Sequence, residues 1–285
     1  MPKILVLGAS GMLGSAMLRY FHGLEDYQVR GTARSGACLP FLPTDVRPLV
    51  IIDVDIESID SIVRLLDTHR PDVIINCIGL IKQLSSANDS VAAIGMNALL
   101  PHRLARLAAL VGARFVHIST DCVFSGRTGL YAESDPPDAT DLYGRSKLLG
   151  EVNGTNAITL RTSIIGHELS SAHGLVGWFL AQSGQVKGFT RAVFSGLPTV
   201  ELARVIHAHV LPQPDLRGLY HVSAAPIAKY DLLTLVKDIY DKDVTIIPDD
   251  TLVIDRSLIS SRFRSETGYS PPDWRDLITT MHRFG

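Results

Sequence analysis

Two side chains with complementary acid–base chemistry lie four residues apart, in the segment Tyr143-Gly-Arg-Ser-Lys147. On a helix, this spacing places a phenol and an ammonium group on the same face. A nearby ammonium group lowers the pKa of a phenol, which then exchanges protons more readily near neutral pH. The pair therefore indicates acid–base catalysis. The alternative is a surface helix with an ordinary pair of neighbours.

A second group of reactive side chains follows an apolar run, in HISTDCVFSG at 117–126. The run predicts a strand that ends at Thr120, whose hydroxyl would hydrogen-bond a substrate oxygen opposite the Tyr143 phenol. Cys122 is the strongest nucleophile here, but a thiolate needs a base or a cation beside it. Its neighbour Asp121 would instead raise the thiol pKa. We therefore interpret Cys122 as a packed or pocket-wall cysteine.

A glycine-rich turn, GASGMLG at 8–14, lies between a strand-like run at 3–8 and helical apolar spacing at 12–21. Glycines allow a tight turn, and the N–H groups at a helix N-terminus attract a pyrophosphate. In this setting the pattern predicts dinucleotide binding. The residues expected to contact the cofactor are Gly8, Ser10, Gly11, Met12 and Leu13.

The choice of dinucleotide depends on the end of the second expected strand, where an acidic residue would bind the ribose 2′-hydroxyl of NAD. This chain has Arg34-Ser35 there, and a guanidinium pairs with a 2′-phosphate, which favours NADP over NAD. Arg34 as a solvated loop residue is the alternative. Asp55-Ile56, at the end of the third expected strand, would receive the adenine, unless Asp55 only precedes the helix capped by Ser58.

The elements that must position these groups alternate regularly in the first half of the chain. Apolar runs predict buried strands, and amphipathic segments predict helices between them, which is typical of a doubly wound parallel sheet. The expected strands are 3–8, 29–33, 50–55, 72–79, 113–120, 157–163 and 218–223, and the expected helices are 12–21, 58–70, 89–110 with a kink or restart at Pro101, 142–152, 174–182 and 229–240. The tail is expected to be irregular.

These elements predict an α/β fold with two parts. Residues 1–163 and about 197–225 form the dinucleotide-binding domain, and about 164–196 and 226–285 form a smaller substrate lobe. The 285 residues are 46% hydrophobic, with a net charge of −2, so nothing suggests nucleic acid or a membrane as partner. Three dispersed cysteines indicate a reducing cytoplasm, and the ten histidines show no metal-ligand spacing.

The three motifs together resemble the extended short-chain dehydrogenase/reductases with a Rossmann fold, and more narrowly the dTDP-4-dehydrorhamnose reductase (RmlD-like) subfamily. The segments that carry the resemblance are GASGMLG, STDCVFSG (119–126) and LYGRSKLLGE (142–151), with NCIG (76–79), Asn97, LRTS (160–163) and GLPT (196–199) in support. The similarity covers most of residues 3–220 and weakens in the tail.

The resemblance implies NADP-dependent reduction of the 4-keto group of a nucleotide-activated 6-deoxy sugar. It assigns catalysis to Thr120, Tyr143 and Lys147, with Tyr143 protonating the carbonyl oxygen and Lys147 holding the nicotinamide ribose. Tyr143 and Lys147 thus also contact the cofactor, as would Cys77, Ile78 and Gly79 beside the nicotinamide. Asp121 and Cys122 would border the substrate, Arg191 or Arg262 would pair with its diphosphate, and a homodimer through the two long helices is expected.

The chain departs from the subfamily pattern where a tyrosine is replaced by Cys122 and an aspartate by Ser125. The related 4,6-dehydratases have a glutamate at the position of Cys122, which disfavours dehydration. A nucleotide-sugar epimerase needs only the same tyrosine and a retained cofactor, so it stays an alternative. A second alternative is a non-catalytic, NADP-binding subunit that regulates another enzyme, because a fold and a cofactor site do not fix a function.

Overall fold

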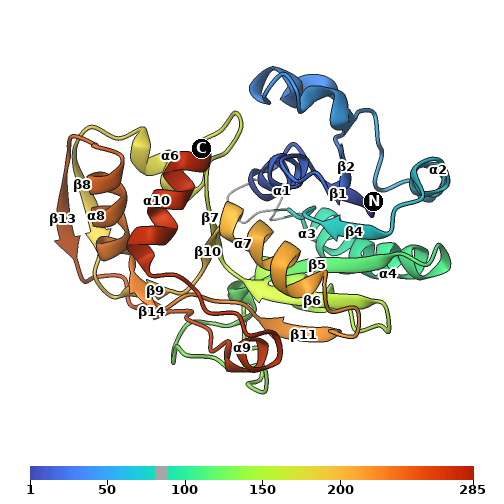
Figure 1. The fold of residues 1–285 in the computed structure, drawn as a ribbon. Coiled ribbons are helices and arrows are strands. Elements are labelled where there is room, and N and C mark those ends of the chain that lie inside the picture. The colour runs from blue at the N-terminus through green and yellow to red at the C-terminus, as the bar shows by residue number, and fades with distance from the viewer. Residues whose placement is uncertain (81–88) are drawn as a thin grey trace.

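A computed structural model describes residues 1–80 and 89–285. Its centre is a seven-stranded sheet in the order β11-β6-β5-β4-β1-β2-β3, with every neighbouring pair parallel (Figure 1). The strands are β1 (Lys3–Leu7), β2 (Gln28–Thr32), β3 (Val50–Ile51), β4 (Val73–Asn76), β5 (Arg114–Thr120), β6 (Ala157–Thr162) and β11 (Gly218–His221). The expected doubly wound parallel sheet is confirmed.

The two faces of the sheet bury different side chains of the same strands. Ile4 and Val6 of β1 belong to one core cluster, and Leu5 and Leu7 belong to another. The first face is covered by α1 (Met12–His22) and α7 (Thr199–Val205), and the second by α2 (Ile59–His69) and α4 (Leu100–Leu110). Burial on both faces explains why the strands are almost continuously apolar.

The long segment expected as one helix from 89 to 110 consists of three pieces. It begins with α3 (Ser90–Ala93), passes through a π-helical turn at Ile94–Leu99, and continues as α4. Pro101 lies in the first turn of α4, where its missing N–H costs no hydrogen bond. The next helix, α5 (Leu142–Leu149), lies beside the π-helical turn and carries the Tyr–Lys pair.

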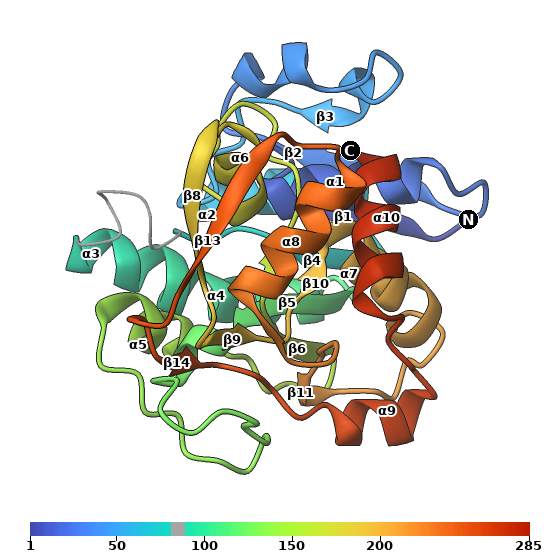
Figure 2. The same ribbon diagram turned by 90° about the vertical axis from the view of Figure 1, so that its left-hand side faces the viewer.

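Smaller elements form a second lobe at one end of the sheet (Figures 1 and 2). They are β7 (Ile164–Ile165), α6 (Leu175–Leu180), β8 (Gly184–Phe189), β9 (Ala192–Phe194), β12 (Ile227–Ala228), α8 (Lys229–Ile239), β13 (Val244–Asp249), β14 (Ile254–Asp255) and α10 (Trp274–Phe284). Two further elements connect to the central sheet: β10 (Leu197–Pro198) pairs with β7, and α9 (Ser261–Thr267) packs against the edge strand β11. β8 pairs with β13, and β9 pairs with β12 and β14.

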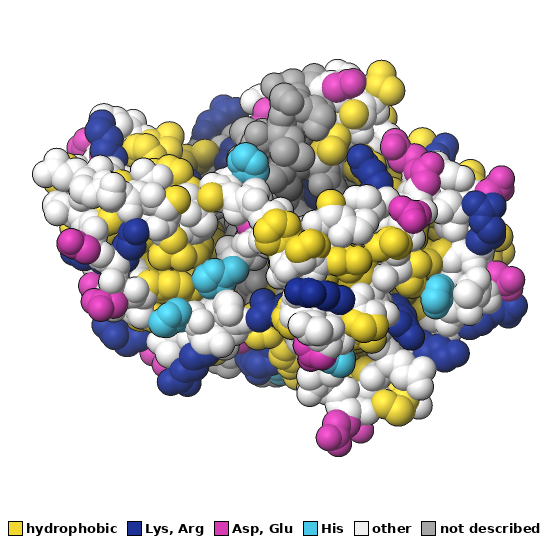
Figure 3. Space-filling view, turned by 90° about the horizontal axis from the view of Figure 1, so that it is seen from above, with side chains coloured by type: hydrophobic (Ala, Val, Ile, Leu, Met, Phe, Trp, Pro, Cys, Tyr) yellow, Lys and Arg dark blue, Asp and Glu magenta, His cyan; other side chains and the backbone are white. Residues whose placement is uncertain are grey.

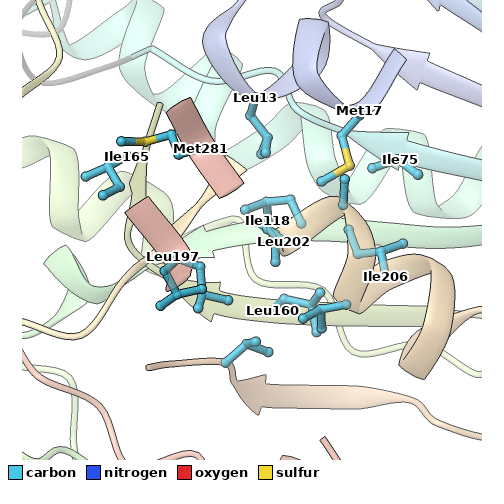
Figure 4. Packing of buried hydrophobic residues seen from close by; sticks show 14 of the residues in the cluster. Leu13, Met17, Ile75, Ile118, Leu160, Ile165, Leu197, Leu202, Ile206 and Met281 are labelled. Atoms are coloured by element: carbon cyan, nitrogen blue, oxygen red, sulfur yellow. The ribbon is translucent and has the colours of Figure 1, made fainter. Parts of the chain in front are cut away.

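The lobe and the sheet share one core. Figure 4 shows Leu13 and Met17 of α1, Ile118 of β5 and Leu202 of α7 converging with Met281 of α10. The same cluster continues into the lobe through residues of α6 and α8. A continuous core of this kind holds the lobe against the sheet, on the side where the strands end.

Two sequence-based expectations about elements are wrong. The third strand was expected at 50–55 but stops at Ile51, and Asp53 adopts a left-handed conformation with φ 59° that cannot continue a strand. The tail is not irregular, because it contains α9 and α10. Asp273 caps α10, and its apolar residues at 274, 277, 278 and 281 have helical spacing and are buried.

The surface seen from above carries Lys and Arg side chains interspersed with Asp and Glu (Figure 3). That face has no broad area of a single charge, in keeping with the net charge of −2. In residues 1–80 and 89–285, no helix has both the length and the hydropathy needed to cross a membrane. The described residues also contain no cluster of His, Cys, Asp or Glu side chains able to hold a metal ion.

Candidate active site

A cavity of about 690 Å³ lies at the carboxyl ends of the central strands. The strand order reverses between β1 and β4, and ligands of doubly wound sheets bind at such a reversal. Most of the expected site residues line this cavity: Ser10, Gly11, Met12, Leu13, Cys77, Ile78, Gly79, Thr120, Asp121, Cys122, Tyr143 and Lys147. The structure thus gathers the three sequence motifs in one place.

The glycine-rich turn has the shape that a pyrophosphate requires. Gly8 has φ 87°, and a Cβ there would lie 2.9 Å from the Ile78 side chain. A Cβ on Gly14 would lie 2.1 Å from the Gly8 carbonyl oxygen, so only glycine lets α1 start so close to β1. Gly11 begins α1 without a side-chain cap, which leaves helix N–H groups available to a phosphate. The turn therefore fits a dinucleotide.

Gly144 explains how Tyr143 reaches the end of β5. A Cβ at Gly144 would lie 2.2 Å from the Cys122 carbonyl oxygen, so α5 meets the turn after β5 backbone to backbone. The Asp141 carboxylate caps α5 by accepting a 2.8 Å hydrogen bond from the Gly144 N–H. This close contact brings the half-buried Tyr143 next to Thr120 and Cys122.

Burial raises the pKa of the acidic groups in the cavity. It raises the pKa of the Tyr143 phenol, with a further contribution from Cys122, so the expected lowering by Lys147 is not what dominates here. Burial, with Asp121 beside it, raises the pKa of the Cys122 thiol to about 12, and burial also raises the pKa of Asp121. Cys122 is thus no ready nucleophile, and the Tyr143 phenol is protonated at neutral pH.

Thr120 ends β5 with its hydroxyl held in place. Its Oγ1 accepts a 3.1 Å hydrogen bond from the Cys122 N–H and donates a 3.2 Å hydrogen bond to Asp121 Oδ1. A hydrogen bond to Thr120 also acts on the Tyr143 phenol and lowers its pKa slightly against the effect of burial. The hydroxyl groups of Thr120 and Tyr143 therefore lie close together in the cavity.

Lys147 is buried, and its Nζ donates a 2.8 Å hydrogen bond to the Ile118 carbonyl oxygen. Burial lowers the pKa of Lys147 to about 8, while Glu151 and Cys77 act in the opposite direction. Glu151 is itself held by Arg161 and Ser119 at 2.7 Å each, which fastens the end of α5 to β5 and β6. The ammonium group therefore has a fixed position beside the cavity.

Asn97 links α5 to the segment after β4. Its Oδ1 accepts a 2.8 Å hydrogen bond from the Leu80 N–H, and its Nδ2 donates to Ser146 Oγ at 3.2 Å. A Cβ at Gly79 would lie 3.2 Å from Asn97 Oδ1 and 3.8 Å from Lys147 Nζ. The absence of a side chain at Gly79 thus leaves room for a ligand next to Lys147.

The remaining expected cofactor residues do not line the cavity, but they follow β1, β2 and β3 at the same edge of the sheet. Gly8 donates its N–H to Thr32 Oγ1 at 3.3 Å, which ties the glycine-rich turn to the end of β2. Arg34 follows two residues later and is exposed, as is Ser35. Asp55 is exposed, with its carboxylate bound to the Glu57 N–H, and Ile56 is buried in the second core cluster.

Arg191 and Arg262, the expected diphosphate partners, do not line the cavity. Arg262 lies on α9, where it binds Glu266 at 3.1 Å and stacks over the Tyr220 ring. Arg191 is exposed just before β9. The spacing of the motifs carried no information on either residue, since both belong to the lobe outside them.

Two cations that sequence reasoning missed do line the cavity, Lys229 at the start of α8 and Arg256 after β14. Arg256 Nε donates to the Phe124 carbonyl oxygen at 2.9 Å. Both cations act to lower the pKa of Asp121 against the larger effect of burial. No motif marks them, because they come from separate segments that only the folded lobe brings together.

Comparison of the whole chain with known proteins agrees with the geometry of the site. A family model described as "RmlD substrate binding domain" matches residues 2–248. The chain belongs to the RmlD substrate-binding domain family. The expected resemblance to the RmlD-like subfamily is thereby confirmed.

Two curated relatives place this RmlD family member among proteins of different roles. It is 30% identical to the "Probable low-salt glycan biosynthesis reductase Agl14" of Haloferax volcanii, over 97% of this chain and 96% of the relative. It is 28% identical to "Methionine adenosyltransferase 2 subunit beta" of Danio rerio, over 84% of this chain and 74% of the relative.

Solved structures share the fold of this RmlD family member. A dTDP-4-dehydrorhamnose reductase of Bacillus anthracis, in complex with NADP, superposes with a TM-score of 0.80 at 22% identity and covers 99% of both chains. A hypothetical dTDP-4-dehydrorhamnose reductase of Sulfolobus tokodaii gives a TM-score of 0.74 at 25% identity, over 96% of this chain and 98% of that one.

Proposed function

We propose that the chain is an NAD(P)H-dependent oxidoreductase that reduces the 4-keto group of a nucleotide-activated sugar, with a 6-deoxy sugar in deoxysugar or polysaccharide biosynthesis as the favoured substrate. The observation that carries the proposal is the position of Thr120, Tyr143 and Lys147 in one cavity beside an open glycine-rich turn. Membership of the RmlD family and the reductase from Haloferax volcanii support it.

Each of the three residues has a distinct task in this reaction. Bound nicotinamide supplies a hydride to the carbonyl carbon. The Thr120 hydroxyl turns its proton from Asp121 to the carbonyl oxygen and orients that oxygen. Tyr143 transfers its phenolic proton to the same oxygen as the C–O double bond becomes a single bond. Lys147 holds the nicotinamide ribose and stabilises the phenolate left on Tyr143, which regains a proton from solvent.

The second lobe, about 164–196 and 226–285, is proposed to hold the substrate, while 1–163 and about 197–225 hold the cofactor. Lys229 and Arg256 support this division, because both come from the lobe and both line the cavity. We assign the substrate diphosphate to them in place of Arg191 and Arg262. Asp121 and Cys122, between these cations and Tyr143, would contact the sugar.

NADP is the proposed cofactor, with NAD as the alternative. Support comes from Arg34, which is exposed two residues beyond the Thr32 hydroxyl that contacts the glycine-rich turn. The Arg34 guanidinium has the geometry to pair with a 2′-phosphate.

Replacing Arg34 by alanine should weaken NADPH binding by about ten- to hundredfold, the effect of losing a hydrogen-bonded charge pair. NADH binding should not change. Titration of both cofactors by nicotinamide fluorescence measures this. Arg30→Ala, four residues earlier on β2, is the control, because the Arg30 guanidinium binds the Pro48 carbonyl oxygen. An equal loss for NADH and NADPH, or a wild type that prefers NADH, would contradict the assignment.

A regulatory, non-catalytic role is the second candidate, and the similarity to a methionine adenosyltransferase subunit beta favours it. It predicts tight NADPH binding without turnover on any keto sugar, and co-purification with another enzyme. An epimerase would interconvert sugars without net oxidation of added NADPH. Stoichiometric NADPH oxidation therefore distinguishes the reductase from the other two functions. Interconversion of nucleotide sugars in the same reaction then distinguishes the epimerase from the non-catalytic subunit.

A homodimer through the long helices is also proposed. Val91 of α3, Ile94 of the π-helical turn and Leu149 of α5 are exposed apolar residues, and His102 bonds the Leu149 carbonyl oxygen between the helices. Leu149→Lys should then halve the mass measured by light scattering, because a charge at a dimer interface costs its desolvation. A wild-type chain that is already monomeric would disprove the dimer.

A further inference from the structure

The segment Cys77–Leu80, which follows β4, touches both halves of the proposed site. Ile78 packs where a side chain on Gly8 would have to fit, so the segment abuts the glycine-rich turn. Gly79 lies beside Lys147 Nζ, which the proposed function assigns to the nicotinamide ribose. A small shift of this segment would therefore change the space for the cofactor both at the glycine-rich turn and at Lys147. We call this part of the cavity, between the segment and Lys147, the nicotinamide channel.

Asn76 holds the first part of this segment, as Asn97 holds its end. The Asn76 Oδ1 accepts a 3.1 Å hydrogen bond from the Ile78 backbone N–H. A backbone N–H only donates, so the oxygen of the amide must face Ile78 and the Nδ2 group must face the other way. Nδ2 then lies 3.1 Å from Nδ1 of His117, in the middle of β5.

This arrangement fixes the proton on the His117 ring. Because Asn76 donates to Nδ1, that nitrogen carries no proton, and the neutral ring has its N–H at Nε2. His117 is fully buried, and Nε2 is the one buried side-chain N or O in the described residues without a hydrogen-bond partner. Burial, assisted by Lys147 and His102, lowers the pKa of His117 well below its ordinary value and keeps the ring neutral.

An unpartnered buried N–H costs about 1–3 kcal/mol, so His117 is a poor choice for stability alone. Its ring neither lines the cavity nor reaches a reacting atom. His117 Nδ1 supplies a hydrogen-bond acceptor for Asn76 Nδ2. This hydrogen bond keeps Asn76 Oδ1 turned toward the Ile78 N–H. A protonated ring would present a donor there and force the amide to rotate.

We infer that His117 is a positioning residue for the cofactor: through Asn76 it fixes the Cys77–Leu80 segment that forms one wall of the nicotinamide channel. The inference rests on the proposed cofactor site and goes beyond it, because His117 contacts neither substrate nor cofactor. It assigns an indirect functional role to a fully buried residue behind the cavity.

The test is the affinity for NADPH, measured by nicotinamide fluorescence in His117→Leu, Asn76→Ala and the double variant. His117→Leu should weaken binding about tenfold, the worth of one hydrogen bond that sets the channel wall. The double variant should bind no more weakly than Asn76→Ala, because both changes break the same chain of contacts. His117→Asn, which restores an acceptor near the Nδ1 position, should recover most of the affinity.

Thermal unfolding and a matched control separate positioning from general damage. His117→Leu exchanges one unpartnered buried donor for another, at Asn76 Nδ2, so its melting temperature should stay close to that of the wild type. Val116→Ala changes the opposite face of β5, away from the side chains of His117 and Asn76, and should bind NADPH within twofold of the wild type. If His117→Leu does not fold, His117→Phe, which keeps a planar ring, replaces it.

Three results would overturn the inference: unchanged NADPH affinity in folded His117→Leu or His117→Phe, the same loss in Val116→Ala, or additive losses in the double variant. A wild type that does not bind NADPH would refute both this inference and the proposed function. A wild type that binds NADPH but reduces no keto sugar would refute the reductase alone, and the binding experiment would still decide the role of His117.

Discussion

Replacing Tyr143 by phenylalanine should lower kcat by about 10²- to 10⁴-fold, the usual contribution of a positioned acid. The Tyr143 phenol is protonated at neutral pH, because burial raises its pKa. The Thr120 hydroxyl lies beside it in the cavity. Phenylalanine fills the same space without a proton to give. NADPH oxidation under saturating substrate measures the loss.

The variant should still bind NADPH, because cofactor contacts are assigned to the glycine-rich turn and Lys147. Tyr27→Phe is the matched control, since Tyr27 packs against Phe21 and His207 away from the cavity and should retain full activity. Activity of Tyr143→Phe within a few-fold of the wild type would remove the acid role from Tyr143.

Replacing Lys147 by methionine should lower kcat/KM for NADPH by roughly 10²- to 10³-fold, the worth of one to two hydrogen bonds to a charged group. The folded state should not suffer, because methionine removes a buried ammonium group whose hydrogen bond goes to the Ile118 carbonyl oxygen. Thermal unfolding should therefore show equal or greater stability. Loss of folding with loss of activity would point to a structural role.

The pH dependence of kcat/KM for NADPH follows from the ionisation of the Lys147 ammonium group. Burial lowers the pKa of Lys147 to about 8, so the charged form predominates below that pH and is lost as the pH rises through it. In the wild type, kcat/KM for NADPH should fall above pH about 8. In Lys147→Arg, which stays charged, that decline should be absent up to pH 10. An identical decline in both proteins would assign it to another group.

Much of the fold follows from local patterns, because the parallel strands are buried on both faces and read as continuous apolar runs. The same holds for the site residues next to strand ends: Gly11, Thr120 and Lys147 each lie where a motif on a predicted element would place them. Motif and element reinforce each other there, since the carboxyl ends of parallel strands meet at one edge.

The features that sequence reasoning missed depend on contacts between distant segments. Lys229 and Arg256 enter the cavity from the lobe, and neither belongs to a recognisable pattern. The role of His117 depends on which atom of Asn76 faces it, 41 residues earlier in the chain. In contrast, α10 was visible in the spacing of its apolar residues after the Asp273 cap, and was missed only because its flanking prolines suggested irregular chain.

The surroundings of Cys122 make its thiol a poor nucleophile. Burial and Asp121 hold its thiol protonated, and its carbonyl oxygen, rather than its sulfur, makes the contact that matters, with Gly144. The related dehydratases have a glutamate at the position of Cys122. In this chain, the backbone of that position is where α5 packs against the turn after β5. The side chain itself lines the cavity, where the proposed substrate would contact it.

The central claim is that this cavity reduces a keto sugar, and the most direct measurement is NADPH oxidation with a panel of 4-keto and 4-keto-6-deoxy nucleotide sugars, with NADH alongside. The account predicts one NADPH oxidised for each hydroxyl formed at C4, with NADPH preferred over NADH, and no turnover by Tyr143→Phe. Tight NADPH binding with no oxidation on any member of the panel would contradict it.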